Sequence, residues 1–283
     1  MAGQGCNQPI SGTTRIVALL GHPAAHTKSP CMQNAAFRAA GLDCRYVAFD
    51  VLPSSLADAV NGIRALRLLG ANVTIPHKEA VPALLDEVDH EAAFIGAVNT
   101  IVNRDGRLCG YNTDGRGFMR SLEDAGIETA GRRVLMLGAG GAARAVGYYL
   151  AQQAAELLIA NRTPERAERL AADLLEVGAD VRGVSMADVQ HAGIMSGVDV
   201  IINATSAGLN PSDPSPADET LFTSRHAVCD LIYHDTPLIL GARRAGARTL
   251  NGQGMLLWQG ALAFELWTGL SAPVEIMREA LAG

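Results

Sequence analysis

A glycine turn between an apolar strand and an alanine-rich helix carries the first chemical signal in the sequence. Residues 134–137 run as a buried strand into the string G-A-G-G-A-A. Gly138 permits a tight turn, Gly140 lets a diphosphate approach the backbone, and Ala143 is small enough for helix to pack on strand. Glycine turns without a ligand are common, but the flanking strand and helix favour a dinucleotide site. The candidate cofactor contacts in the turn are Gly138, Gly140, Gly141 and Ala142.

The next predicted strand, residues 156–160, ends at Asn161 and Arg162. An acidic residue at this point would accept hydrogen bonds from the adenosine ribose of NAD, whereas a guanidinium would hold a 2′-phosphate. Arg166 follows after Thr163, which we expect to cap the next helix. Taken singly, each arginine is more simply interpreted as a solvated charge on a helix. The two together, at a point where the acidic residue of NAD sites is absent, favour binding of a 2′-phosphate. The sequence therefore predicts NADP.

Lys78 and Asp114 are the ionisable pair with an obvious chemical use, because both stand among asparagine and threonine residues. Reduced nicotinamide delivers hydride to a carbonyl, and the resulting alkoxide needs a proton from a neighbouring group. A lysine can donate that proton, and a carboxylate beside it would hold the ammonium and tune its pKa. Taken singly, Lys78 reads as a solvated loop lysine and Asp114 as a helix N-cap. Their polar surroundings favour the catalytic interpretation.

Three short polar clusters follow predicted strands or begin predicted helices. They cover residues 26–30, 72–78, and 99–100 with 112–115. They hold many uncharged hydrogen-bond donors and few charges, which suits a polyhydroxylated small molecule with one carboxylate.

Composition limits the other classes of protein. A formal net charge of −6 disfavours nucleic acid, which requires a basic face. Five cysteines without C-x-x-C or Cys/His spacing predict buried, reduced thiols and no metal site. No apolar run reaches about 18 residues, and the polar start of the chain has no secretory leader. We therefore expect a cytoplasmic protein without a membrane segment.

The elements that must position these residues alternate between strand and helix, which predicts an α/β fold. With 283 residues, two domains are expected. We predict a substrate-binding and catalytic domain, residues 1–113 plus 252–283, with a mixed, mainly parallel sheet. Residues 114–251 should form a Rossmann-type NADP-binding domain, and the C-terminal helical segment should return to the first domain. A cleft between the two would bring substrate and nicotinamide together.

The polar clusters and the glycine turn together resemble the shikimate dehydrogenase family. The matching strings run in the family's order from Gly21 to about Thr268, and they are GHPAAHTKSP, GANVTIPHK, GAVNT, NTDG, GAGGAARA, NRTPERA, INATSAG, DLIY and NGQGMLLWQGA. Several of these strings are weak evidence alone, but together and in this order they are highly specific. The resemblance implies reversible, NADPH-dependent reduction of 3-dehydroshikimate to shikimate, a step towards aromatic amino acids.

The resemblance also implies roles for single residues. Lys78 and Asp114 match the family's catalytic pair. The positions that match substrate contacts are Thr27, Ser29, Asn72, Thr74, Asn99, Tyr233 and Gln259. Those that match cofactor contacts beyond the glycine turn are Asn161, Arg162, Thr163, Arg166 and Thr205.

The chain departs from the family pattern at a few positions and so leaves the ring acid open. Thr27 stands where many members have serine, Gln33 where a histidine is common, and His234-Asp235 replace Asn-Pro. Such changes are worth about 1–3 kcal/mol per contact, enough to shift preference between close analogues. A paralogue acting on quinate or aminoshikimate and a catalytically silent NADP-binding protein are the alternatives. The sequence leaves the oligomeric state open, a homodimer included.

Overall fold

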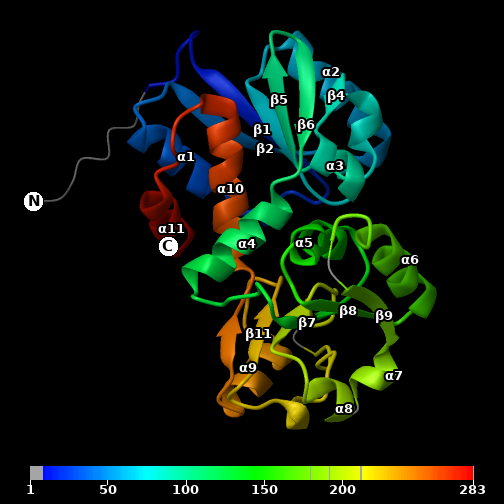
Figure 1. Ribbon diagram of the computed structural model, residues 1–283. Coiled ribbons are helices and arrows are strands. Elements are labelled where there is room, and N and C mark those ends of the chain that lie inside the picture. Colours follow the sequence, from blue (N-terminus) through cyan, green and yellow to red (C-terminus); the bar gives the residue numbers. More distant parts are fainter. Residues whose placement is uncertain (1–8, 179, 191, 211, 283) are drawn as a thin grey trace, which may run out of the picture. The chain divides into compact units, whose positions relative to one another are not determined.

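The computed structural model describes residues 9–178, 180–190, 192–210 and 212–282, and the chain divides into two compact units (Figure 1). The first unit runs to Thr113 and resumes at Gly260, and the second comprises Asp114–Gln259. Helix α10 (Gln253–Thr268) begins in the second unit and ends in the first. Each unit has one sheet with helices packed on it, so the predicted α/β class is confirmed.

The first unit contains a six-stranded mixed sheet in the order β2-β1-β3-β5-β6-β4. Its strands are β1 (Arg15–Gly21), β2 (Cys44–Asp50), β3 (Gly70–Val73), β4 (Glu87–Val88), β5 (Thr100–Arg104) and β6 (Arg107–Tyr111). The three strands β2, β1 and β3 are parallel, β5 and β6 form an antiparallel hairpin, and β5 pairs antiparallel with β3. The unit's helices are α1 (Ser29–Ala39), α2 (Leu56–Ala65), α3 (His90–Ile95) and α11 (Val274–Ala282).

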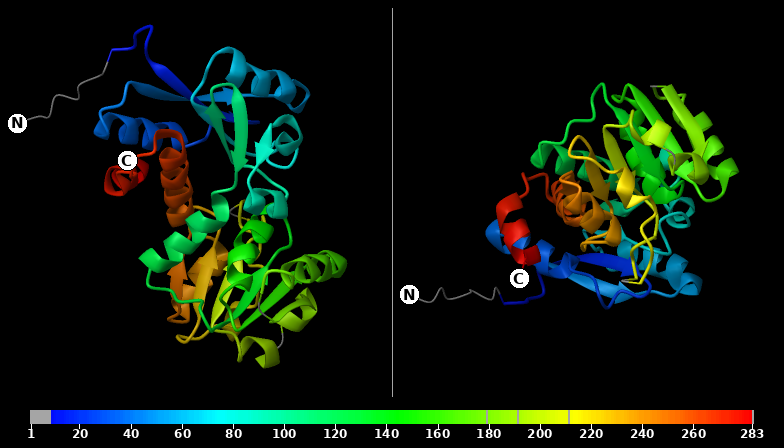
Figure 2. Two further views of the ribbon diagram at one scale, coloured as in Figure 1. Left: turned by 45° about the horizontal axis from the view of Figure 1, so that its top comes forward. Right: turned by 90° about the horizontal axis from the view of Figure 1, so that it is seen from below.

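Side chains that alternate along the parallel strands supply a core to both faces of this sheet. Ala18 and Leu20 of β1 belong to the hydrophobic cluster that includes Val60 of α2. On the other face, α1 packs against β2 and α11 (Figure 2), and Phe37 of α1 lies 5.5 Å from Phe264 of α10 between ring centroids. Helix α1 therefore lies between the edge strand and the C-terminal helices, and the polar residues at its start are held on a rigid element.

The second unit has a six-stranded parallel sheet in the order β12-β11-β10-β7-β8-β9. Its strands are β7 (Arg133–Leu137), β8 (Glu156–Asn161), β9 (Asp180–Ser185), β10 (Val200–Asn203), β11 (Ala227–Asp230) and β12 (Arg248–Leu250). Its helices are α4 (Asp114–Asp124), α5 (Gly141–Ala151), α6 (Pro164–Leu174), α7 (Met186–Val189), α8 (Ala192–Met195) and α9 (Pro237–Arg244). Strands β8 and β9 are added on one side of β7, and β10, β11 and β12 are added on its other side. The strand order therefore reverses between β7 and β10. Ligands of such sheets bind at the carboxyl ends of the strands beside this point.

Two details differ from the sequence predictions. Strand β9 was not predicted, because D-V-R-G-V-S is mostly polar and only Val181 is fully buried. Strand β9 is held in the sheet by its parallel pairing with β8, and Glu156 of β8 also pairs with both Arg133 of β7 and Arg182 of β9. The cysteines were predicted to be buried, and Cys31 is exposed.

The other cysteines described, Cys44, Cys109 and Cys229, are buried free thiols, and Cys6 lies outside the described residues. Among the helices described, none combines the length and apolar composition needed to cross a bilayer.

Candidate active site

The glycine turn after β7 has the backbone geometry that a dinucleotide site requires. Gly138 has φ = +111°, a left-handed conformation, and a Cβ there would lie 2.8 Å from the Ala204 carbonyl oxygen. Gly140, by contrast, has φ = −96°, and a Cβ there would meet no protein atom within 4 Å. The backbone at Gly140 therefore faces open space at the start of α5, where amide N–H groups favour an anion. Both glycines fit the roles expected from the sequence.

These two glycines give a pair of opposite predictions. Gly138→Ala should lower the melting temperature, because the side chain is strained at positive φ and collides with the Ala204 carbonyl. Gly140→Ala should leave the melting temperature nearly unchanged and raise the Kd for NADP⁺, because only a bound diphosphate would meet the new methyl group. Thermal unfolding and NADP⁺ titration of both variants check this. Unchanged NADP⁺ affinity in Gly140→Ala would place the diphosphate elsewhere.

The end of β8 presents the two predicted phosphate-binding arginines on the surface. Arg162 and Arg166 are both exposed, on either side of the first residues of α6. The prediction that Thr163 caps α6 is wrong in its detail: Thr163 occupies the N-cap position, but its side chain makes no capping hydrogen bond. Instead, Asn161 Nδ2 donates to the Thr163 carbonyl oxygen at 3.0 Å, which fixes the turn between the arginines.

A buried carboxylate organises the loops that follow β10 and β11. Asp230 is fully buried, and it accepts hydrogen bonds from Ile232 N (3.0 Å), Asn203 Nδ2 (3.1 Å) and Thr236 Oγ1 (2.7 Å). Burial raises the pKa of the Asp230 carboxyl, and the three hydrogen bonds oppose the rise. Asn203 Oδ1 in turn accepts from Thr205 N at 3.0 Å and Thr205 Oγ1 at 2.7 Å. Asp230 thus positions Thr205 beside the switch point.

Asp230 and Asn203 were not among the predicted site residues. Within D-L-I-Y, only Tyr233 was singled out, and its side chain is 55% exposed. The available signal was the aspartate itself, since an acidic residue directly after a buried strand must find hydrogen-bond donors.

In the first unit, two predicted substrate residues, Asn72 and Asn99, belong to one buried hydrogen-bond network. The hydroxyl of Tyr46 donates to Asn72 Oδ1 at 2.7 Å. Asn72 Nδ2 donates to the Asn99 carbonyl (3.0 Å) and to Thr100 Oγ1 (3.1 Å). Thr100 Oγ1 donates to Asn99 Oδ1 at 2.9 Å. The network holds amides and hydroxyls from β2, β3, β5 and Asn99, the residue before β5, in fixed orientations.

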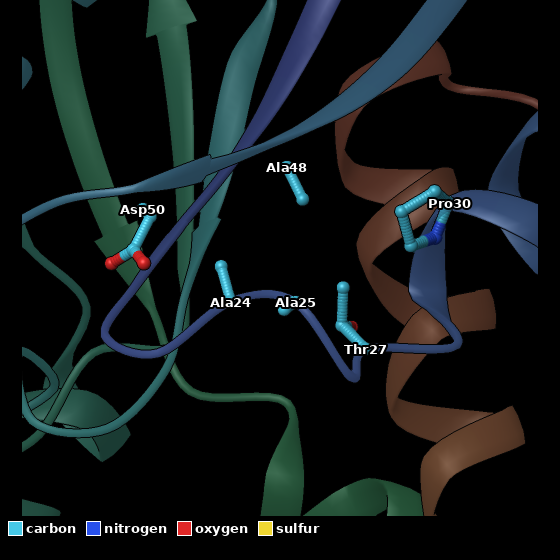
Figure 3. Close-up of a pocket in the computed structure, with 6 residues that line it drawn as sticks. All are labelled: Ala24, Ala25, Thr27, Pro30, Ala48 and Asp50. Carbon is cyan, nitrogen blue, oxygen red and sulfur yellow. The ribbon is translucent and has the colours of Figure 1, made fainter.

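Thr27 lines a hollow of about 290 Å³ at the carboxyl ends of β1 and β2 (Figure 3). The hollow is lined by Ala24, Ala25, Thr27, Pro30, Ala48 and Asp50. Thr27 Oγ1 accepts a hydrogen bond from Ser29 N at 3.3 Å, which holds the Thr27 hydroxyl at the start of α1. Asp50 lies at the end of β2 and pairs with His22 at 2.6 Å. Thr27 thus borders an open space next to α1, as a substrate contact requires, whereas Ser29 is buried at the first residue of α1.

Thr74 and Lys78 lie in the turn that follows β3. The Thr74 N–H donates to the Leu20 carbonyl at 2.9 Å, and a Cβ at Gly21 would lie 2.4 Å from Thr74 Cγ2. Only a glycine at position 21 therefore permits this placement of Thr74. Lys78 is half-buried, and its carbonyl accepts from Val98 N at 2.9 Å, which ties the turn to the segment before β5.

Asp114 and Gln259 belong to the second unit, and Asp114 is buried at the first residue of α4. The residue before it, Thr113, donates its N–H to Asn99 Oδ1 at 2.9 Å, so the buried network continues to the start of α4. Gln259 Nε2 donates to the Leu256 carbonyl of its own helix at 2.8 Å. A Cβ at Gly117 would lie 2.6 Å from Gln259 N, so α4 and α10 pack closely here. Among the described residues, no three His, Cys, Asp or Glu side chains are placed to hold a metal ion.

Comparison with known proteins matches the chain to three family profiles in succession. Residues 19–101 match the shikimate dehydrogenase substrate-binding domain, residues 122–215 match shikimate/quinate 5-dehydrogenase, and residues 252–282 match the shikimate 5′-dehydrogenase C-terminal domain. Shikimate dehydrogenase (NADP⁺) of Moorella thermoacetica is 50% identical over 279 residues, which cover 96% of this chain and 94% of that protein.

Two solved structures resemble the whole chain. Shikimate 5-dehydrogenase from Thermus thermophilus, in complex with NADP(H) and shikimate, has a TM-score of 0.85 and 39% identity, covering 95% of this chain and 98% of that one. Quinate dehydrogenase from Corynebacterium glutamicum, in complex with NAD, has a TM-score of 0.87 and 32% identity, covering 95% and 99%. The chain therefore belongs to the shikimate dehydrogenase family of NADP-dependent oxidoreductases.

Proposed function

We propose that this chain catalyses the reversible, NADPH-dependent reduction of 3-dehydroshikimate to shikimate. The observation that carries the proposal is the buried network around Asn72 and Asn99, which presents neutral hydrogen-bonding groups. Such groups recognise hydroxyls without adding charge. The likeness to a structure that holds NADP(H) and shikimate supports the same substrate class.

The proposal divides the work between the two units. The first unit and the C-terminal segment bind the ring acid, and the second unit binds NADP. The open space at Gly140 and the exposed pair Arg162 and Arg166 fit a diphosphate and a 2′-phosphate respectively. Thr163, Thr205 and the rest of the glycine turn complete the proposed cofactor contacts.

Lys78 and Asp114 handle the proton in this proposal. NADPH, when bound, would supply a hydride to the carbonyl carbon, and the carbonyl oxygen would then need a proton. Lys78 donates a proton to that oxygen, and in the reverse direction it accepts the hydroxyl proton. The Asp114 carboxylate stabilises the lysine ammonium and keeps it directed at the oxygen. Hydride and proton together convert the ketone into the alcohol.

The other polar residues orient the ring. Thr27 and Ser29 donate to the substrate carboxylate, and Asn72 offers one remaining lone pair of Oδ1 to a ring hydroxyl, because both Nδ2 hydrogens are already bound. The further proposed ring contacts are Thr74, Asn99, Tyr233 and Gln259.

Quinate is the second candidate substrate, because a quinate dehydrogenase has the same fold and the methyl group of Thr27 reshapes the carboxylate end of the hollow. We expect NADPH oxidation with 3-dehydroshikimate to exceed that with 3-dehydroquinate at least tenfold in kcat/KM, about the effect of one altered contact. Absorbance of NADPH and mass spectrometry of the product check this. A preference for 3-dehydroquinate would assign the chain to the quinate branch, and the absence of turnover with both would favour a silent NADP-binding protein.

The cellular setting follows from the same proposal. Three buried free thiols suit a reducing compartment, and we place the enzyme in the cytoplasm. We expect its partners to be small molecules, since a net charge of −6 disfavours nucleic acid. A homodimer stays a prediction, which light scattering of the purified protein would test.

A further inference from the structure

We propose that Tyr46 is a positioning residue for the substrate, an assignment that rests on the function proposed above. Its phenol sets the side chain of Asn72, a proposed ring contact on another strand of the same sheet. The sequence gives no sign of this role, because a tyrosine in an alternating strand reads as core.

The hydroxyl of Tyr46 holds the side-chain oxygen of Asn72, a proposed ring contact. Tyr46 is 2% exposed, and burial raises the pKa of its phenol, so the hydroxyl keeps its proton and donates it to Asn72 Oδ1 at 2.7 Å. Both Nδ2 hydrogens of Asn72 are held by Asn99 and Thr100, and the phenol supplies the donor to Oδ1 on the other side of the amide. Without the phenol, the Asn72 amide is held on its Nδ2 side alone, and Oδ1 is no longer fixed for the ring.

Tyr46 is itself held from several directions. β2 is an edge strand, and the backbone groups of Tyr46 that face outward bind the side chain of Asn34 on α1: Tyr46 N donates to Asn34 Oδ1, and Asn34 Nδ2 donates to Tyr46 O, both at 2.9 Å. The same Asn34 Nδ2 donates to the Pro30 carbonyl at 2.8 Å, next to Ser29.

The ring of Tyr46 is fixed as well. It lies 6.1 Å from the ring of Trp267 between centroids, and Trp267 is anchored by a hydrogen bond from Nε1 to the Ile101 carbonyl at 2.9 Å. Backbone and ring are therefore both immobilised, which is the arrangement expected of a residue that orients others. A tyrosine needed only for packing would not require a hydroxyl directed at Asn72.

The test is Tyr46→Phe, which keeps the ring and removes the hydroxyl. We expect the KM for shikimate to rise about tenfold, with kcat within about twofold and the KM for NADP⁺ unchanged, because positioned hydrogen bonds are lost only on the ring-acid side. Tyr111→Phe is the matched control, since the Tyr111 hydroxyl accepts only an exposed hydrogen bond from Arg104 among the bonds described. In this control all three parameters should stay at wild-type values.

A double-mutant cycle separates positioning from structural support. In an Asn72→Ala background, Tyr46→Phe should raise the KM for shikimate by less than twofold, because the acceptor is already absent. If Tyr46→Phe does not fold, Asn34→Asp gives a second test. This substitution removes the hydrogen bond from Asn34 Nδ2 to the Tyr46 carbonyl but keeps the Tyr46 hydroxyl. It should also raise the KM for shikimate.

Two outcomes would overturn the assignment in different ways. A lower melting temperature of Tyr46→Phe with an unchanged KM for shikimate would show that Tyr46 is structural only and would leave the proposed function intact. If the wild-type enzyme does not turn over shikimate at all, the proposed function fails, and the role of Tyr46 fails with it.

Discussion

Lys78→Ala should lower kcat for shikimate oxidation by about 10²- to 10⁴-fold, the usual contribution of a general acid or base. The Kd for NADP⁺ should change less than twofold, because Lys78 lies in the first unit and the proposed phosphate contacts lie in the second. Initial rates and fluorescence titration of NADPH measure the two quantities. A large loss of NADP⁺ affinity would contradict the assignment of Lys78 to the proton step.

The two lysines of the chain, Lys28 and Lys78, allow a matched control for this prediction. The other 21 of the 23 basic residues are arginines. Because arginine keeps its proton at any working pH, it can replace a lysine charge but not a lysine that transfers a proton. Lys78→Arg should therefore be nearly as inactive as Lys78→Ala, whereas Lys28→Arg, at an exposed residue before α1, should keep wild-type turnover. Substantial activity in Lys78→Arg would show that Lys78 contributes only a positive charge and does not transfer the proton.

Replacing both Arg162 and Arg166 with alanine should remove the preference for NADP⁺ over NAD⁺. A hydrogen bond to a charged group is worth about 1.5–3 kcal/mol, so each arginine should change kcat/KM for NADP⁺ by about 10- to 100-fold. The values with NAD⁺ should stay within about twofold, because NAD⁺ has no 2′-phosphate. Steady-state kinetics with both cofactors check this.

Arg169 provides the control for the arginine pair, because it is exposed on α6 about one turn beyond Arg166. Arg169→Ala should leave both cofactors unaffected. If the Arg162/Arg166 variant loses NADP⁺ and NAD⁺ activity equally, the two arginines support the fold of the turn rather than the phosphate.

Local patterns were enough to predict the dinucleotide half of the molecule. Gly138 is required for its backbone conformation, and Gly140 for the free space beside it. Both requirements arise within a few residues of the turn, and the structure shows both features. The order of strand, turn and helix from β7 to β8 follows from the same local signals. Strand β9 was missed because its sequence is half polar, whereas its pairing with β8 is a contact that the local pattern does not reveal.

The supporting residues of the site could not be predicted, because their roles depend on contacts across the sequence. Tyr46 meets Asn72 from a strand 26 residues away, and Asp230 meets Asn203 from 27 residues away. A tyrosine or aspartate in a strand does not reveal which partner it will find. The missing cap at Thr163 has a similar cause, because the turn is stabilised by Asn161 instead.

The most direct test of the proposed function is the initial rate of cofactor reduction by the purified wild-type protein, with shikimate and either NADP⁺ or NAD⁺. We predict turnover with shikimate and NADP⁺, and a kcat/KM for NADP⁺ at least 100-fold above that for NAD⁺, the size expected for the two arginine contacts. No turnover with shikimate, or equal rates with the two cofactors, would contradict the proposal.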